Sequence, residues 1–325
     1  MRAVRLHELG GPDALRIEEL ADPICDDDDV LVRLTFAALN RRDVFITRGM
    51  YPGIALPSTL GADGAGVRAD TGENVVIDPM LHWGNDPHVW AEGAQVLGMP
   101  RDGTLADAIA IPKQNVYPMP AHLTADQAAA LPLAGLTAYR ALITRGRAMM
   151  GETVLVTGIG GGVQSFVMQF ALALGATVIA TSSSDAKLAN ARALGAQHTV
   201  NYRSNPDWYK DLRKLPAIDL AVDSAGGEAF SRAIDAVRPG GRVVTYGGTT
   251  ATSNVRLFSV FWKHLDILGS SMGSPRDFTD MLAFVSRHQL RPVIDRIFPV
   301  TRIIDAFKHL EASEQCGKIV IDLSH

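Results

Sequence analysis

A glycine-rich stretch near the middle of the chain has the residue types and spacing that hold phosphate groups. An apolar run at 154–156 leads into the glycines, and apolar residues then recur at intervals of three and four before a second apolar run at 176–180. Strand, glycine turn, amphipathic helix and strand form a βαβ unit, which holds a dinucleotide pyrophosphate at its helix N-terminus. The stretch therefore predicts a nicotinamide-dependent enzyme. The cofactor contacts expected here are Gly158, Gly161, Gly162 and Val163.

The residues after the second apolar run bear on which dinucleotide binds. In enzymes that use NAD, an Asp or Glu at the tip of this strand bonds the ribose 2′-hydroxyl. Here Ser182 and Ser183 follow the strand, and Lys187 lies one helical turn further on. Neutral donors and a cation suit a 2′-phosphate, so we expect NADP (NADPH) as the cofactor. Tyr202 and Arg203, after the third strand, could flank the adenosine.

Two alternatives to this cofactor preference remain open. The serines could serve only to cap the next helix, for which Ser184 is the best placed. Asp185 could also turn toward the ribose and favour NAD.

Composition and charge exclude several classes of function. The 325 residues suffice for two domains, and 47% are apolar, enough to fill a core. With a net charge of −4, nothing suggests a surface for nucleic acid or an anionic membrane. Two distant cysteines, Cys25 and Cys316, exclude a disulfide framework and argue against a cysteine-based zinc site. Without a signal peptide or a long apolar span, we expect a soluble cytoplasmic protein that acts on a small molecule.

The elements that would position these residues change in character along the chain. Short alternating runs such as 30–36 make the first third β-rich, and 81–98 reads as an irregular lobe. From about Thr124, helices and strands alternate, which predicts an α/β architecture with a parallel, doubly wound sheet. The segment from about 275 has helical stretches and a last strand at 318–322, and we expect it to return to the β-rich domain.

Several further motifs accompany the glycine loop along the chain. They stand in order at 38–43, 60–67, 102–106, 131–139, 240–244, 267–272 and 317–320. On these motifs the chain resembles the medium-chain dehydrogenase/reductase superfamily over nearly its whole length, most closely the quinone-oxidoreductase branch. The resemblance implies a GroES-like β-barrel catalytic domain from 1–121 and 276–325, and a Rossmann dinucleotide-binding domain from 122–275. The resemblance adds Thr137, Ser270 and Lys318 within these motifs, and Gly247 just after the motif at 240–244, to the expected cofactor contacts.

The same resemblance extends to zinc alcohol dehydrogenases, whose catalytic metal requires three protein ligands and one open position. The corresponding positions here are Asn40, Ala62 and Leu133. Because alanine and leucine cannot ligate a metal, we expect no catalytic zinc.

The lobe at 81–98 is the counterpart of the family's structural zinc lobe, but it contains no cysteine. We expect it to pack around Trp83 and Trp90. A metal held by His82, Asp86 and His88 is the alternative that composition allows.

The glycine motif itself departs from the family at Gln164, which replaces the last glycine. That glycine allows close helix–strand packing. Gln164 could narrow the loop, donate a bond to phosphate or weaken cofactor binding. Gly161 and Gly162 remain, so binding is still expected.

Hydride transfer without a metal needs an acceptor whose developing charge hydrogen bonds can stabilise, as in quinones and α,β-unsaturated carbonyls. The resemblance places suitable groups at Asn40, whose amide can donate to a substrate oxygen, and at Tyr51, whose phenol can donate. Asp43 would orient its neighbours, and Asp63 could hold a loop. Asn40 as a simple turn residue and Tyr51 as ordinary packing are the alternatives.

We therefore expect an NADPH-dependent, zinc-independent reductase of quinones or enones. An alcohol or aldehyde dehydrogenase lacking its metal is the second possibility, and it is weaker because nothing here would acidify an alcohol. A non-catalytic NADP-binding protein is the third. We also expect a homodimer, because 265–269 matches the last strand of the Rossmann sheet and an exposed apolar edge pairs readily with its copy.

Overall fold

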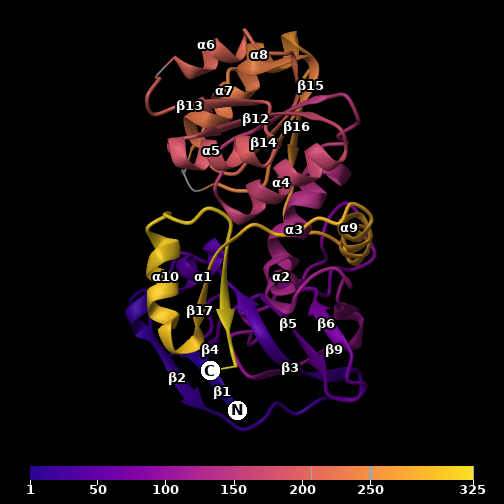
Figure 1. Cartoon of the computed structure of the whole chain (residues 1–325), viewed down its shortest axis with the longest axis vertical. Coiled ribbons are helices and arrows are strands. Elements are labelled where there is room, and N and C mark those ends of the chain that lie inside the picture. Colours follow the sequence, from indigo (N-terminus) through magenta and orange to yellow (C-terminus); the bar gives the residue numbers. More distant parts are fainter. Residues whose placement is uncertain (206, 249–251, 325) are drawn as a thin grey trace. The chain divides into compact units, whose positions relative to one another are not determined.

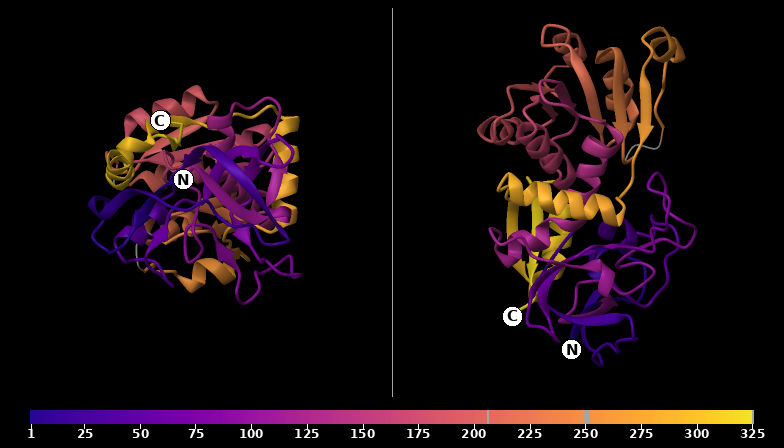
Figure 2. Two further views of the ribbon diagram at one scale, coloured as in Figure 1. Left: turned by 90° about the horizontal axis from the view of Figure 1, so that it is seen from below. Right: turned by 90° about the vertical axis from the view of Figure 1, so that its right-hand side faces the viewer.

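The computed structural model describes residues 1–205, 207–248 and 252–324. The chain divides into two compact units: unit 1 is Met1–Ala134 with Ser274–His325, and unit 2 is Gly135–Gly273. Both chain ends lie in unit 1 (Figures 1 and 2). One unit is β-rich and the other is a parallel sheet with helices, so the expected α/β class is confirmed. Helix α2 (Ala125–Ala130) belongs to unit 1, although the boundary expected after 121 places it with the dinucleotide-binding domain.

Unit 1 is built on a mixed sheet of order β10-β6-β5-β3-β18-β17, in which β9 also pairs with β3. Smaller sheets have the orders β2-β1-β4 and β7-β8. The strands are β1 (Arg2–Leu6), β2 (Leu15–Glu19), β3 (Asp29–Ala38), β4 (Ser58–Thr59), β5 (Asp63–Arg68), β6 (Asn74–Ile77), β7 (Met80–Leu81), β8 (Gln95–Val96), β9 (Ala108–Pro112), β10 (Val116–Pro118), β17 (Ile294–Pro299) and β18 (Lys318–Asp322). The helices are α1 (Arg41–Thr47), α2, α9 (Pro275–Arg287) and α10 (Ile303–Glu311), and α3 (Pro132–Tyr139) begins here and continues into unit 2.

Strand order in unit 1 brings distant parts of the sequence together. The central strand β3 pairs antiparallel with β5, where Ala38 faces Asp63, and antiparallel with β18, where Ala38 faces Val320. Ala38 and Val320 pack with Ala130 of α2 in a small buried cluster. The end of β3, the start of β5 and the start of β18 therefore meet at one edge of the sheet.

Unit 2 is a doubly wound sheet whose strands are all parallel, in the order β13-β12-β11-β14-β15-β16. The order reverses direction between β11 and β14, and ligands of such sheets bind at this switch point. The strands are β11 (Thr153–Val156), β12 (Thr177–Ser182), β13 (His198–Asn201), β14 (Ile218–Asp223), β15 (Val237–Thr245) and β16 (Asp266–Gly269). The helices are α4 (Gly162–Ala173), α5 (Asp185–Ala193), α6 (Trp208–Leu212), α7 (Gly227–Ala236) and α8 (Leu257–Trp262), and a π-helical segment, Arg140–Arg145, follows α3.

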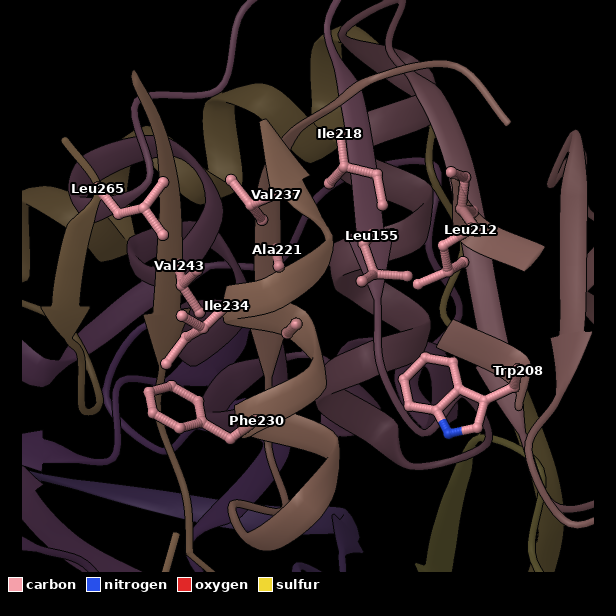
Figure 3. Packing of buried hydrophobic residues seen from close by; sticks show 12 residues of the cluster. Leu155, Trp208, Leu212, Ile218, Ala221, Phe230, Ile234, Val237, Val243 and Leu265 are labelled. Atoms are coloured by element: carbon pink, nitrogen blue, oxygen red, sulfur yellow. The ribbon is translucent and has the colours of Figure 1, made fainter. Parts of the chain in front are cut away.

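The core of unit 2 packs the sheet against its helices. Leu155, Ala221 and Val243 come from three neighbouring strands and meet side chains of α6 and α7, including Trp208 and Phe230 (Figure 3). The nearly continuous apolar strands are typical of a parallel sheet buried on both faces. This rigid core fixes the strand ends from which the glycine loop emerges. Within the described ranges, none of the helices has the length and hydropathy that a bilayer span needs.

Candidate functional site

The glycine loop joins β11 to α4 at the switch point of the unit 2 sheet. Gly158 (φ 70°) and Gly160 (φ 129°) adopt backbone conformations that side-chain-bearing residues rarely reach. A Cβ added to Gly161, the N-cap of α4, would meet nothing within 4 Å. The N–H groups in the first turn of a helix have no intrahelical partners, and here open space lies beside them. The loop therefore fits the pyrophosphate of a nicotinamide dinucleotide, the cofactor that this fold implies.

Two expected cofactor contacts, Ser182 and Lys187, adjoin this loop. The buried hydroxyl of Ser182 donates to the carbonyl of Ile159 (3.3 Å). The Lys187 side chain lies over Gly160, because a Cβ built there would lie 2.5 Å from its Cδ and 3.3 Å from its Nζ. The structure thus places an ammonium group beside the glycine loop. Ser183 follows Ser182 at the tip of β12 and is half-buried.

The neighbouring residues bear on the alternatives for cofactor preference. Ser184 is the N-cap of α5, and its hydroxyl accepts from the N–H of Lys187 (3.4 Å). The carboxylate of Asp185 accepts from the side-chain amide of Asn201 (2.7 Å). Helix capping is thus assigned to Ser184, and Asp185 already has an amide partner at the end of β13.

Tyr202 and Arg203 follow β13 and are exposed. The Tyr202 ring lies 6.4 Å from that of Trp208, and the N–H of Arg203 donates to the Asn201 side chain (2.9 Å). Both residues stand after the strand that neighbours β12, at the same edge of the sheet as Ser182.

The remaining expected contacts of unit 2 follow other strands of the sheet. Gly247 comes after β15, and a Cβ there would lie 2.5 Å from the Ser224 carbonyl oxygen, so only glycine fits. Ser270 follows β16 and donates its N–H to Thr245 O (2.9 Å), while its buried hydroxyl has no partner among the described residues. Because carboxyl ends of parallel strands share one edge, both belong to the edge that carries the glycine loop. Thr137 is buried in α3.

Polar groups beneath the loop were missed by the sequence analysis. The carboxylate of Asp223, at the end of β14, accepts from the Thr157 hydroxyl (2.6 Å) and from the N–H of Gly226 (2.7 Å). Burial raises the pKa of Asp223 above its ordinary value. The sequence does hold one indication of this role, because Asp223 ends an otherwise apolar strand. A carboxylate buried at that position needs hydrogen-bond partners at the sheet edge.

In unit 1, Asn40, Asp63 and Lys318 form a buried polar cluster. The Lys318 ammonium donates to Asp63 Oδ2 (2.7 Å), to Asn40 Oδ1 (2.7 Å) and to the Leu39 carbonyl (2.9 Å). Asn40 Nδ2 donates to Asp63 Oδ2 (2.8 Å). A lysine ammonium has three protons, and all three are used here, so none remains for a cofactor phosphate. If the Asn40 amide were turned over, its NH₂ group would face the Lys318 ammonium, and two donors cannot bond each other. The hydrogen bonds of the cluster therefore fix the orientation of the Asn40 amide.

Asp63 also ties the cluster to the positions discussed for zinc. Its second oxygen accepts the backbone N–H of Leu133 (2.7 Å), and its carbonyl accepts the Thr104 hydroxyl (2.7 Å). Asp63 thus anchors the start of α3 and the loop that contains Thr104. Across 1–205, 207–248 and 252–324, the structure groups no three His, Cys, Asp or Glu side chains that could hold a metal ion.

Asp43 and Tyr51, the other expected catalytic residues, are linked by Arg42, which the sequence did not single out. Asp43 is fully buried, its Oδ2 accepts the Asn40 backbone N–H (2.8 Å), and burial raises its pKa to about 6. The Arg42 guanidinium lies 3.9 Å from the Asp43 carboxylate, donates to the Tyr51 hydroxyl (3.3 Å) and lies over the Tyr51 ring. Asp43 therefore orients the Asn40 backbone, and a cation adjoins the phenol.

In the lobe at 81–98, Trp83 is buried as expected, whereas Trp90 is exposed. The rings of Trp83 and Trp90 meet edge to face at 6.2 Å, and Trp83 Nε1 donates to the Asp86 carbonyl (2.8 Å). The Asp86 carboxylate accepts the His88 backbone N–H (2.7 Å). Both the carboxylate and the backbone carbonyl of Asp86 therefore accept hydrogen bonds from residues of the lobe itself.

Known proteins share this architecture. Residues 26–121 match the family model described as the alcohol dehydrogenase GroES-like domain, and 162–287 match that of the zinc-binding dehydrogenases. The zinc-type alcohol dehydrogenase-like protein YogA of Leptosphaeria maculans is 34% identical, over 95% of this chain and 94% of its own. The chloroplastic NADPH-dependent alkenal/one oxidoreductase of Arabidopsis thaliana is 29% identical, over 99% of this chain and 79% of its own.

Among solved structures, that of an NAD-dependent alcohol dehydrogenase superposes with a TM-score of 0.92 at 36% identity, covering all of both chains. This similarity, together with the GroES-like match and the doubly wound sheet, confirms the resemblance found in the sequence. The chain belongs to the medium-chain dehydrogenase/reductase family and is an oxidoreductase of that family.

Proposed function

We propose that this chain reduces quinones or α,β-unsaturated carbonyls with NADPH and without zinc. The observation that carries the proposal is the buried cluster of Lys318, Asn40 and Asp63. Catalytic zinc needs three ligands around an open position. Here the amide of Asn40 stands at the first ligand position, and the Lys318 ammonium lies 2.7 Å from the carboxylate of Asp63 in the motif at 61–63. The positive charge of the Lys318 ammonium would repel a divalent cation at this position.

The polar groups of unit 1 suit an acceptor that gains negative charge on oxygen. A nicotinamide dinucleotide, when bound at the glycine loop, would supply the hydride needed at a conjugated carbon of the substrate. Asn40 Nδ2 donates one N–H in a hydrogen bond to Asp63, and its second N–H can donate to a substrate oxygen as negative charge develops there. The Tyr51 phenol, beside the Arg42 guanidinium, can donate in the same way, and a hydroxyl or water supplies the proton that completes the reduction.

The preference for NADPH rests on the tip of β12. Ser182 and Ser183 stand where NAD enzymes carry a carboxylate, and the Lys187 ammonium adjoins Gly160. A 2′-phosphate carries roughly two negative charges at neutral pH, as a phosphoserine does. The Ser182 hydroxyl already donates to the Ile159 carbonyl. The half-buried Ser183 hydroxyl and the Lys187 ammonium are therefore the groups that can donate to this phosphate, whereas a carboxylate would repel it.

Alcohol oxidation with NAD is the second candidate, because the solved structure with 36% identity is described as an NAD-dependent alcohol dehydrogenase. It is less well supported, since alcohol oxidation needs a group that acidifies the hydroxyl, and zinc serves that role in the zinc enzymes.

A substrate screen separates these functions. We expect NADPH oxidation with quinones or enones that persists after treatment with a chelator, and little NAD⁺ reduction with alcohols. Stoichiometric zinc whose removal abolishes activity would contradict the proposal. Binding of NADPH without turnover on any of these substrates would instead favour a non-catalytic role.

We also propose that the chain forms a homodimer through unit 2. In the described part of the chain, β16 pairs only with β15, so its other edge is open. The preceding helix α8 exposes four large apolar side chains that a second copy could cover. These are Leu257, Phe258, Phe261 and Trp262, all more than half exposed.

A further inference from the structure

Gln164, which replaces the last glycine of the loop motif, lies inside the protein. It is the third residue of α4, and its side chain is buried beneath the loop. Nε2 donates to the Thr157 carbonyl (2.7 Å) and, more weakly, to the Val222 carbonyl (3.4 Å). Thr157 begins the loop and Gln164 lies seven residues further on. The bond therefore closes the loop at its base, and the amide does not extend toward the open space beside Gly161.

The opposite side of the loop is held by β12. The N–H of Ile159 donates to the Thr181 carbonyl (2.7 Å), and the N–H of Gly158 donates to the Thr181 hydroxyl (3.2 Å). The side chains and backbone of β12 thus secure one side of the loop. Among the residues that the structure describes, Gln164 is the one whose side chain ties the β11 end of the loop to α4. A glycine at this position could not make that bond.

The acceptor end of the Gln164 amide also indicates a role for this residue. Its Oε1 is buried and has no hydrogen-bond partner within the described residues. An unsatisfied buried acceptor destabilises a fold, so such groups call for an explanation. The explanation that the geometry offers is the donor end of the same amide, which fixes the loop.

We propose that Gln164 is a positioning residue that preforms the glycine loop for the pyrophosphate of the dinucleotide. This inference rests on the proposed function, in which that cofactor is NADPH. A loop already held in its binding conformation loses less conformational freedom when the ligand arrives, and affinity rises accordingly. Gln164 acts through the Thr157 carbonyl and makes no contact with phosphate itself.

The first test needs no cofactor. Gln164→Met keeps the length and volume of the side chain but removes the donor. We expect hydrogen exchange at the Ile159 and Ser165 amides to quicken about tenfold, because the loop opens locally more often. Gln169 lies on the same helix and is half-buried, so Gln169→Met is the matched control and leaves these rates unchanged.

The second test is fluorescence titration with NADPH. We expect Gln164→Met to raise the Kd about tenfold, the effect of losing one buried hydrogen bond, and Gln169→Met to leave it unchanged. Gln164→Glu gives a distinctive readout, because an ionised carboxylate only accepts whereas a protonated one can donate to the Thr157 carbonyl. Relative to wild type, its affinity should recover as the pH falls from about 8 to about 5. Gln169→Glu controls for the added charge.

The outcomes are distinguishable. Equal NADPH affinities and equal exchange rates for Gln164→Met and Gln169→Met overturn this inference and leave the proposed function standing. Failure of the wild type to bind either NADPH or NADH overturns both. Should Gln164→Met not fold, Gln164→Glu carries the test, and a pH profile parallel to that of wild type overturns the inference.

Discussion

Lys318 shows how a single residue changes what a site can do. The family resemblance implied that Lys318 contacts the cofactor. In the structure its ammonium is buried and donates to Asp63, Asn40 and the Leu39 carbonyl. Two charges taken out of water stabilise a fold only when each keeps its partner, and removing one leaves the other uncompensated. The pair also fixes the amide of Asn40. The stability of unit 1 and the chemistry that we propose for it therefore depend on the same three side chains.

We expect Lys318→Met to lower the free energy of unfolding by about 3–5 kcal/mol, because Asp63 is left charged and buried. Urea denaturation measures the change. Lys308→Met is the control: its partner Asp13 is exposed, and loss of such a surface pair costs about 0–1 kcal/mol. Adding Asp63→Asn to Lys318→Met should recover part of the loss, since the uncompensated charge disappears. If both lysine variants lowered the free energy of unfolding equally, the buried pair would contribute no more to stability than the surface pair.

Asp78 makes the stability of the fold depend on pH. It follows β6 and is fully buried, Oδ1 accepts the Met80 N–H (2.9 Å), and burial raises its pKa from 3.8 to about 8. Between these two values the native state holds a proton that the unfolded chain has released. The stabilisation is therefore complete below about pH 4 and is lost as the pH rises toward about 8.

Asp78→Asn should remove this dependence. We expect the variant to gain stability over wild type with increasing pH, by at most about 1.4 kcal/mol per unit, the free energy that corresponds to one pKa unit. Chemical denaturation at several pH values between 5 and 8 measures the gap. Asp280→Asn, on the exposed surface of α9, serves as the control. Parallel profiles for wild type and Asp78→Asn would show that the buried carboxyl does not titrate in this range.

At the level of elements, the turn from β12 to α5 sets the cofactor preference that we propose. Ser182→Asp introduces a carboxylate beside the glycine loop, where the serine hydroxyl now donates to the Ile159 carbonyl. We expect weaker binding of NADPH and equal or better binding of NADH, a change in their ratio of about tenfold or more, since a charge-assisted bond contributes about 1.5–3 kcal/mol.

Paired titrations with both dinucleotides check this prediction. Lys187→Met should move the ratio in the same direction by removing the cation beside Gly160. Ser183→Asp tests the half-buried neighbour, which has more room for a carboxylate. A wild type that already prefers NADH, or a ratio unchanged by these substitutions, would contradict the proposed phosphate pocket.

The elements themselves were largely predictable from the sequence, and their contacts were not. Apolar periodicity is local, so the βαβ unit around the glycine loop, the doubly wound sheet and the β-rich first third could be inferred. The contact of Lys318 with Asn40 joins residues 278 positions apart and depends on β18 lying beside β3. The inward direction of Gln164 likewise follows from packing of α4 on the sheet. No local pattern encodes either fact.

At the scale of the whole molecule, the open edge of β16 and the apolar face of α8 support the proposed dimer. Phe258 stacks on Trp262 with ring centroids 5.4 Å apart, so the aromatic side chains form one continuous exposed surface. Burying a large apolar side chain contributes about 1.5–3 kcal/mol, and several together exceed the cost of association only when they act as one patch. An edge strand beside that patch adds backbone hydrogen bonds to a copy of itself.

We therefore expect sedimentation at micromolar concentration to give twice the mass of one chain. The double variant Phe261→Glu with Trp262→Glu should sediment as a monomer, because a dimer would bury its new charges without partners. Met150→Glu replaces another highly exposed apolar residue of unit 2 and should leave the dimer intact. A monomeric wild type would contradict the proposal outright, whereas a dimer that persists in the double variant would show that a surface other than α8 holds the two copies together.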